Sequence, residues 1–208
     1  MPKGSPERTA ARREEIINAC EKCYQTMSFK EITLKEIGEE TSFSRPTIYN
    51  YFQTKEEIFL ALFEREYYRW NEELERIIEE NETLTKKEIA GKIAGSLEGR
   101  TQLLKLLSMN NFDMEANSRP ERLTSFKTAY GRSIRNIRAI LDKFCPKMSG
   151  EEKENVLYVF FPFMFGIYPY TAVTDRQKKA MKEAGVEYTY FTAYELIDNC
   201  LSRLLGCA

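Results

Sequence analysis

One signal for the start of a helix recurs along this 208-residue chain and constrains its fold more than any other feature. A Ser or Thr is followed three residues later by Glu at Thr33, Thr54, Thr85 and Ser149. In such a capping box the hydroxyl and the carboxylate each accept a hydrogen bond from a backbone N–H of the first helical turn. Apolar residues spaced three and four apart follow these signals, so the sequence predicts an all-α fold.

The first half of the chain contains three clear helices in this pattern. A first helix opens at Ser5-Pro6 and runs to about Met27, and a short second one opens at Thr33. A long helix begins at Thr54 and ends near Glu80; its apolar side carries Ile58, Leu62, Phe63, Tyr67, Trp70, Leu74 and Ile77.

The second half predicts more helices with breaks between them. A break over residues 110–119 precedes Pro120, which opens a helix to about Phe144. Two strongly apolar segments follow at 152–171 and 188–205, joined by a polar connection, and Pro162 predicts a kink in the first of them.

The segment from Ser44 to Phe52 reads as a short helix with a polar outer side. Ile48 and Phe52 lie four residues apart and face inward. Ser44 is a good N-cap, and Pro46 is well placed near the start of the helix. Together with the short helix at Thr33 and the turn around Ser42, it predicts a helix-turn-helix.

Composition bounds the class of protein. A net charge of −1, with 30% charged and 42% hydrophobic residues, is typical of a globular chain. No apolar run is long enough for a membrane span or resembles a signal peptide, so we expect a cytoplasmic protein without a membrane partner. Five scattered cysteines fit a reducing compartment; Cys20 and Cys23 form a C-x-x-C that buried packing explains better than a redox or metal site.

From about Ile16 to Ile58 the chain resembles the DNA-binding domain of the tetracycline-repressor (TetR) family of transcriptional regulators. The resemblance rests on Thr33-Leu34, Ile37-Gly38 and Ser44–Phe52, and on Thr54-Lys55-Glu56 after them. Ser42 stands where the family pattern has glycine, so it must adopt a left-handed backbone or allow a different turn. Gly38 stands where the family has alanine, at a cost of about 1 kcal/mol unless it permits closer packing.

The resemblance implies a helix-turn-helix DNA-binding domain at residues 1–53 and a helical ligand-binding and dimerisation domain at 54–208. Arg45, Thr47 and Asn50 are the candidates for reading base edges in double-stranded operator DNA. The candidates for phosphate contacts are Thr33, Ser44, Tyr49 and Lys55. Taken singly, these residues also fit plain surface charges, caps and packing.

The resemblance also implies a homodimer and a small-molecule effector that releases the DNA. The two apolar segments, 152–171 and 188–205, are the candidates for the dimer interface, with an intramolecular core as the alternative. Aromatic residues that could line an effector pocket, or simply fill the core, are Tyr67, Trp70, Phe112, Phe126, Tyr130 and Phe163.

Other functional classes fit the sequence less well. The chain has no histidine, and we find no nucleophile motif, phosphate loop or metal-ligand spacing. We therefore expect no catalytic residues, no cofactor and no metal. The alternative that remains is a helical dimeric adaptor that does not recognise DNA.

Overall fold

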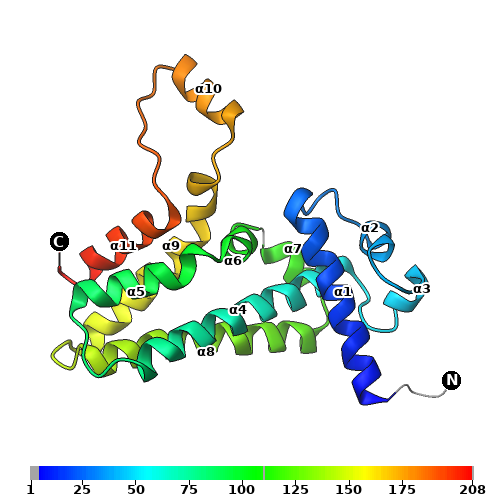
Figure 1. Ribbon diagram of the computed structural model, residues 1–208, viewed down its shortest axis with the longest axis horizontal. Coiled ribbons are helices and arrows are strands. Elements are labelled where there is room, and N and C mark those ends of the chain that lie inside the picture. The colour runs from blue at the N-terminus through cyan, green and yellow to red at the C-terminus, as the bar shows by residue number, and fades with distance from the viewer. Residues whose placement is uncertain (1–4, 110, 208) are drawn as a thin grey trace. The chain divides into compact units, whose positions relative to one another are not determined.

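The computed structural model describes residues 5–109 and 111–207, although it does not describe the side chains of residues 111–113. These residues form α-helices and connecting turns without a strand, which confirms the predicted all-α class (Figure 1). Contacts group them into two units. Unit 1 comprises Met1–Arg65 and Asn110–Ala129, and unit 2 comprises Glu66–Met109 and Tyr130–Ala208.

Unit 1 is built from helices that bury a compact apolar centre. It contains α1 (Pro6–Thr26), α2 (Leu34–Glu39), α3 (Arg45–Ile48), the start of α4 (Lys55–Glu79), α7 (Asn111–Ala116) and the start of α8 (Pro120–Phe144). Its core includes Ile16, Cys20, Ile37, Ile48 and Phe52, all with no exposed surface.

The two cysteines of the C-x-x-C belong to this core. Cys20 is fully buried and Cys23 is 7% exposed. Burial raises the pKa of the Cys20 thiol well above its ordinary value, so the thiolate needed for redox or metal chemistry is disfavoured. The packing interpretation of this motif is confirmed.

Unit 2 contains the remainder of α4 and α8 together with five further helices. These are α5 (Lys86–Glu98), α6 (Thr101–Leu107), α9 (Gly150–Thr171), α10 (Asp175–Glu183) and α11 (Ala193–Leu204). Helix α11 packs on both α5 and α9, and α6 packs on α9. Within unit 2, α4 and α8 are joined by polar contacts, in which Arg132 binds Glu75 at 2.8 Å and Asn136 binds Asn71 at 2.9 Å.

Several predicted helix limits are confirmed. Capping boxes at Thr33, Thr85 and Ser149 begin α2, α5 and α9. The helix predicted from Pro120 to Phe144 has those limits. Every apolar residue assigned to the inner side of α4 is buried.

Other limits were wrong. The predicted helix from Ser44 to Phe52 is α-helical only over Arg45–Ile48 and continues as turns. The predicted break at 110–119 contains α7, and the predicted polar connection contains α10. The last helix begins at Ala193 rather than Tyr188, because Thr192 and Glu195 form its capping box.

Helix α9 remains helical through both of its prolines, Pro162 and Pro169. No single helix in the described part of the chain is both long and apolar enough to cross a membrane; α9 and α10 meet the length and composition criteria only as a pair bent by 85°.

Candidate nucleic-acid interface

The helix before the turn is fixed by its own capping box. The Thr33 hydroxyl accepts a hydrogen bond from the Lys35 N–H at 3.1 Å, and the Glu36 carboxylate accepts from the Thr33 N–H at 3.0 Å. Gly38, one turn on, faces α3: a Cβ there would lie 3.4 Å from the Cβ of Arg45. That distance is ordinary van der Waals contact, so the packing of α2 on α3 does not require glycine at this position.

The turn between α2 and α3 is held by side chains rather than by a left-handed residue. No described residue other than glycine has a positive φ. Ser42 therefore does not adopt a left-handed backbone, and the chain forms a different turn here. The Ser42 N–H donates to the carboxylate of Glu15 on α1. The Thr41 hydroxyl donates to the carbonyls of Gly38, at 2.9 Å, and Phe43, at 3.0 Å.

Helix α3 is a single short turn of four residues. Ser44 occupies the N-cap position, but its hydroxyl contacts the Thr47 hydroxyl at 3.2 Å instead of a backbone N–H. Beyond Ile48 the chain keeps turning, with the Phe52 N–H donating to the Ile48 carbonyl at 3.0 Å. Both Ile48 and Phe52 are fully buried, as their spacing predicts.

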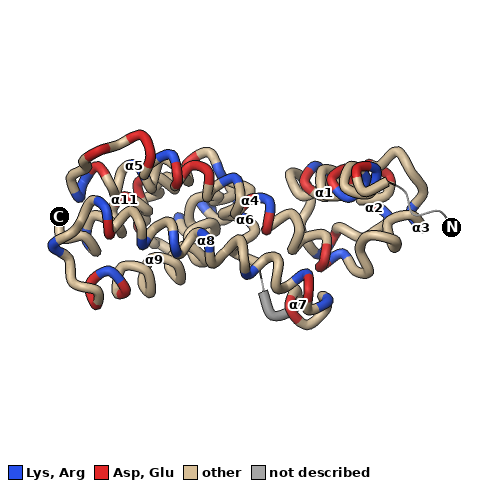
Figure 2. Tube along the Cα trace, turned by 90° about the horizontal axis from the view of Figure 1, so that it is seen from below, with Lys and Arg blue, Asp and Glu red and all other residues tan. Residues whose placement is uncertain are grey.

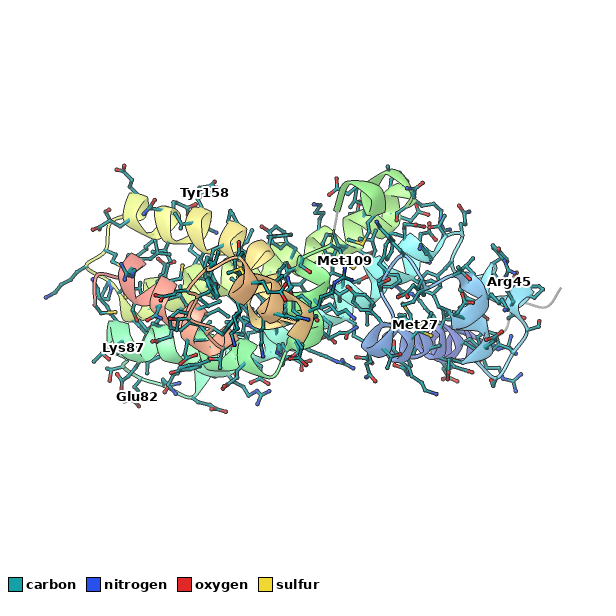
Figure 3. All side chains as sticks on the ribbon, turned by 90° about the horizontal axis from the view of Figure 1, so that it is seen from above. Met27, Arg45, Glu82, Lys87, Met109 and Tyr158 are labelled. Atoms are coloured by element: carbon teal, nitrogen blue, oxygen red, sulfur yellow. The ribbon has the colours of Figure 1, made fainter. Side chains whose placement is uncertain are left out.

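Burial of these two residues leaves the opposite side of the segment open. Arg45, Asn50 and Tyr49 are exposed, Tyr49 to 49%, and Thr47 is half-buried. Arg45 is labelled on this segment in Figure 3. Thr33 and Ser44 are also exposed. The structure therefore presents hydrogen-bonding groups of the kinds that contact phosphates and base edges in one short segment.

Charge on this part of the chain is mixed. Figure 2 shows acidic and basic residues interleaved along α1. Lys55 is drawn inward: its ammonium donates to the carbonyls of Phe29, at 2.8 Å, and Ile32, at 3.0 Å, and lies 4.1 Å from the centre of the Phe29 ring. An ammonium has three donors, so one further donor can serve a phosphate.

An ion pair with a buried carboxylate joins the start of α4 to the residue before α8. The Glu57 side chain is 1% exposed, and the Arg119 guanidinium donates to both of its oxygens, at 2.6 and 2.8 Å. The N–H groups of Gln53 and Arg119 add hydrogen bonds of 2.9 and 3.1 Å. Burial alone would raise the pKa of Glu57, but these donors outweigh it and lower the pKa to about 2.

Residues 117–122 also form hydrogen bonds with the end of the segment that begins with α3. The Tyr51 carbonyl accepts from Arg122 at 3.1 Å and from Arg119 at 3.4 Å. The Thr54 hydroxyl donates to the Asn117 carbonyl at 2.9 Å. We call the contacts of Arg119 and Arg122 with Tyr51 and Glu57 the Arg119 clamp.

Sequence reasoning missed the Arg119 clamp. The predicted capping box at Thr54 is only half formed, because the Glu57 N–H donates to the Thr54 hydroxyl at 3.2 Å while the Glu57 carboxylate turns to Arg119 and Gln53. Arg119 lies 62 residues further along the chain, and no local pattern points from one residue to the other.

The aromatic residues considered for an effector pocket fall into separate groups. Tyr67, Trp70 and Tyr130 form one cluster in unit 2 with Phe161, whose ring centroid lies 6.2 Å from Trp70 and 5.5 Å from Tyr130. Tyr67 and Trp70 are fully buried. The Trp70 indole N–H donates to the Ser96 hydroxyl at 2.9 Å.

The other three residues of that set lie elsewhere. Phe126 belongs to unit 1 and packs against Phe63, with 4.8 Å between ring centroids. Phe163 is half-buried on α9, where Phe161 supplies the buried ring. Phe112 lies in α7, and its side chain is outside the described residues. Phe161 is the cluster member that sequence reasoning missed; it is one of several aromatic residues in an apolar run, and periodicity did not single it out.

Two family descriptions match most of the chain. Residues 16–62 match "Bacterial regulatory proteins, tetR family", and residues 64–204 match "Tetracyclin repressor-like, C-terminal domain". The second match alone spans more than half of the chain.

Curated relatives match over a shorter length. The chain is 31% identical over 62 residues to the HTH-type transcriptional repressor Rv1474c of Mycobacterium tuberculosis, which is 30% of this chain and 33% of that protein. It is 35% identical over 63 residues to the HTH-type transcriptional regulator YfiR of Bacillus subtilis, which is 30% of this chain and 31% of that protein. The matches thus cover about a third of these relatives.

Solved structures match the fold along nearly the whole chain. FadR of Bacillus subtilis, solved with stearoyl-CoA, has a TM-score of 0.62 at 17% identity over 94% of this chain and 98% of that one. FadR of Thermus thermophilus, solved with lauroyl-CoA, has a TM-score of 0.58 at 19% identity over 93% of each chain.

Proposed function

This chain belongs to the TetR family of bacterial regulatory proteins, and we propose that it is a dimeric, ligand-responsive transcriptional repressor. In this proposal it binds a near-palindromic operator in the cytoplasm and is released by a small-molecule effector. The observation that carries the proposal is the α3 segment, whose buried Ile48 and Phe52 turn a set of hydrogen-bonding side chains outward.

We assign two kinds of DNA contact to this segment and its surroundings. Arg45 reads guanine through its forked donors, Asn50 pairs with adenine, and Thr47 offers a hydroxyl and a methyl group. Tyr49, which is 49% exposed, holds a phosphate together with Lys55. Thr33 and Ser44 are exposed and add hydroxyls, and contacts of this kind fix position rather than sequence.

A dimer is part of the proposal because one short helix reads too few base pairs for a specific site. Helices α9 and α11 are the proposed interface. The apolar face of α11 that includes Ile197 and Leu201 is already buried within the chain, so α9 supplies the more open surface: Tyr158 is 75% exposed and Val159 is 42% exposed.

Effector release requires a ligand that binds more tightly to a conformation unsuited to the operator. Helices α4 and α8 both include residues of unit 1 and residues of unit 2. In unit 1, α8 begins at the Arg119 clamp; in unit 2, it carries Tyr130 of the aromatic cluster. We propose that ligand binding at this cluster acts on the clamp through α8.

The DNA-binding proposal is tested by titrating purified protein against fragmented DNA from its source at several salt concentrations. Arg45→Ala and Tyr49→Ala should abolish specific binding while circular dichroism and dimer mass stay unchanged. Lys92→Ala and Tyr68→Ala are the controls, because they remove an exposed basic residue and an exposed tyrosine from unit 2.

The salt dependence separates the proposal from the adaptor alternative. Binding through several phosphates must weaken steeply as salt rises, because counterions are released from the DNA. Salt-insensitive binding, or full binding by both interface variants, would refute the proposed interface. For the effector, a ligand panel should include long-chain acyl-CoAs, since two proteins of the same fold were solved with them.

A further inference from the structure

Residues 169–190 form a projecting segment of unit 2, which we call the tyrosine arm. It comprises the end of α9, all of α10 and part of the extended chain that leads to α11, and α10 stands away from α9 and α11 (Figure 1). Helix α10 buries none of its residues. Large apolar side chains of the arm are between 40% and 55% exposed; these are Tyr170, Val186, Tyr188 and Tyr190.

The arm forms an open pocket of about 640 Å³ whose lining residues all lie between Pro169 and Tyr190. The lining includes Tyr170, Met181, Tyr188 and Tyr190. The Tyr188 ring lies 6.5 Å from Tyr170 and 5.1 Å from Tyr190, measured between centroids. Small-molecule sites usually have rigid, preformed walls. This pocket is formed by one exposed segment of chain alone, so its open side suits a protein partner that covers it.

The outer face of α9 leads directly into this pocket. Tyr158, Pro162, Gly166 and Pro169 recur at helical spacing along it, and all four are exposed. Tyr158 is 75% exposed, more than any other large apolar side chain in the described part of the chain. It is labelled on the outer edge of α9 in Figure 3. An exposed apolar face of this kind marks an interaction surface.

We propose that the tyrosine arm of one copy receives Tyr158 from a second copy of this chain. This inference rests on the dimer of the proposed function and names one of its contacts. About a two-fold axis, antiparallel copies of α9 bring together residues that lie equally far from the axis. Pro162 and Gly166, which have little side-chain bulk, mark the place of closest approach.

If the two-fold axis passes midway between Pro162 and Gly166, it fixes which residues of the two α9 helices lie at the same level. Tyr158 lies six residues before this level and Tyr170 six residues after it, which is about 9 Å in each direction along a helix. Tyr158 of the second copy then lies at the level of Tyr170, which lines the pocket. Burying an aromatic ring among tyrosines is a typical feature of energetically important interface contacts.

Charge complementarity favours the same antiparallel orientation. The first turn of α9 carries exposed Glu151 and Glu152. Beyond the end of α9 the arm carries Arg176, Lys178, Lys179 and Lys182. In antiparallel copies the start of α9 of one copy lies toward the end of α9, and so toward the arm, of the other, and pairing of opposite charges favours this orientation.

Photocrosslinking tests the contact. The full-length chain is made with benzoyl-phenylalanine at Tyr158, mixed with isotope-labelled wild type, irradiated and analysed by mass spectrometry. We expect crosslinks between light and heavy chains that map to residues 169–190. Benzoyl-phenylalanine at Tyr68, a surface position on α4, is the matched control and should not reach the arm.

Equilibrium measurements add an independent test. Tyr158→Ala should raise the dimer dissociation constant about tenfold or more, as expected for an interface hot spot. Glu151→Lys or Glu152→Lys should also weaken the dimer, and adding Arg176→Glu should restore part of the loss. Circular dichroism confirms that each variant is folded.

The outcomes separate this inference from the proposed function. If wild type is dimeric by light scattering but Tyr158 crosslinks only within its own chain, or elsewhere in the partner, the arm contact is overturned and the dimeric regulator stands. The same holds if Tyr158→Ala leaves the dimer unchanged, or if the arm binds phospholipid vesicles instead. If wild type is monomeric at micromolar concentration, the proposed homodimer itself fails.

Discussion

Glu57→Gln removes the negative charge at the centre of the Arg119 clamp and keeps a side chain of almost the same size. In the native protein the carboxylate is 1% exposed and accepts from Arg119 and from the N–H of Gln53. The variant leaves the guanidinium and these donors facing a neutral amide. We expect unit 1 to lose stability at neutral pH and much less in acid.

The magnitude follows from the pKa of Glu57. Lowering that pKa from 4.5 to about 2 corresponds to about 3 kcal/mol of folding free energy, at about 1.4 kcal/mol per pH unit. Because the folded-state pKa is the lower one, this stability is complete above about pH 5 and is lost as pH falls toward 2. The difference between wild type and variant should therefore shrink to about 1.4 kcal/mol at pH 3.

Urea unfolding followed by circular dichroism measures the difference at each pH. Trp70, the one tryptophan of the chain, lies in unit 2, so its fluorescence reports whether that unit unfolds in the same transition. Glu75→Gln is a matched control. It also removes a carboxylate bound by a guanidinium, but one that is 30% exposed, so solvent screening should hold its effect below about 1 kcal/mol.

Two results would refute this reasoning. A variant as stable as wild type at pH 7 would mean that the ion pair gives no net stabilisation, as happens where desolvation cancels attraction. A loss that stays constant from pH 7 to pH 2 would show that packing or hydrogen bonding, rather than the ionisation of Glu57, is responsible.

Two further substitutions test the packing of each unit. Gly38→Ala should raise stability by about 0.5–1 kcal/mol, because the added methyl meets Arg45 at an ordinary 3.4 Å and alanine favours helix; a lower unfolding midpoint in urea would show that α2 and α3 are too close. Phe161→Ala should cost about 3–5 kcal/mol and change Trp70 fluorescence, because it leaves a cavity in the aromatic cluster. Tyr68→Ala, at a surface position, should stay within about 0.5 kcal/mol of wild type in the same titration.

Local signals in the sequence predicted local structure well. The capping boxes at Thr33, Thr85 and Ser149 each involve groups three residues apart, so tertiary contacts had little influence on them. Thr174 with Gln177 and Thr192 with Glu195 carry the same signal and begin α10 and α11. The last helix was placed too early because the aromatic residues before Thr192 were assigned to its apolar face.

Contacts between distant segments could not be predicted in this way. The carboxylate of Glu57 leaves its predicted place in a capping box because a guanidinium 62 residues away binds it more strongly. The aromatic residues of the chain are identifiable from sequence, but their division between Phe63 with Phe126 and the Trp70 cluster depends on how α4 and α8 pack. The roles of the α3 residues in reading DNA stay predictions.

The hydrogen bond from the Ser42 N–H to Glu15 changes which position of the turn is constrained in sequence: Glu15 on α1 is required, and glycine at position 42 is not. A turn that depends on a left-handed residue tolerates little besides glycine. A turn held by its backbone N–H can accept residues other than glycine, but not proline, provided that the carboxylate on α1 is kept. The Ser42 hydroxyl adds a second hydrogen bond to the same carboxylate, so other residues at position 42 lose that bond but keep the turn. In a library built to test the proposed DNA contacts, position 15 is therefore the one to hold constant.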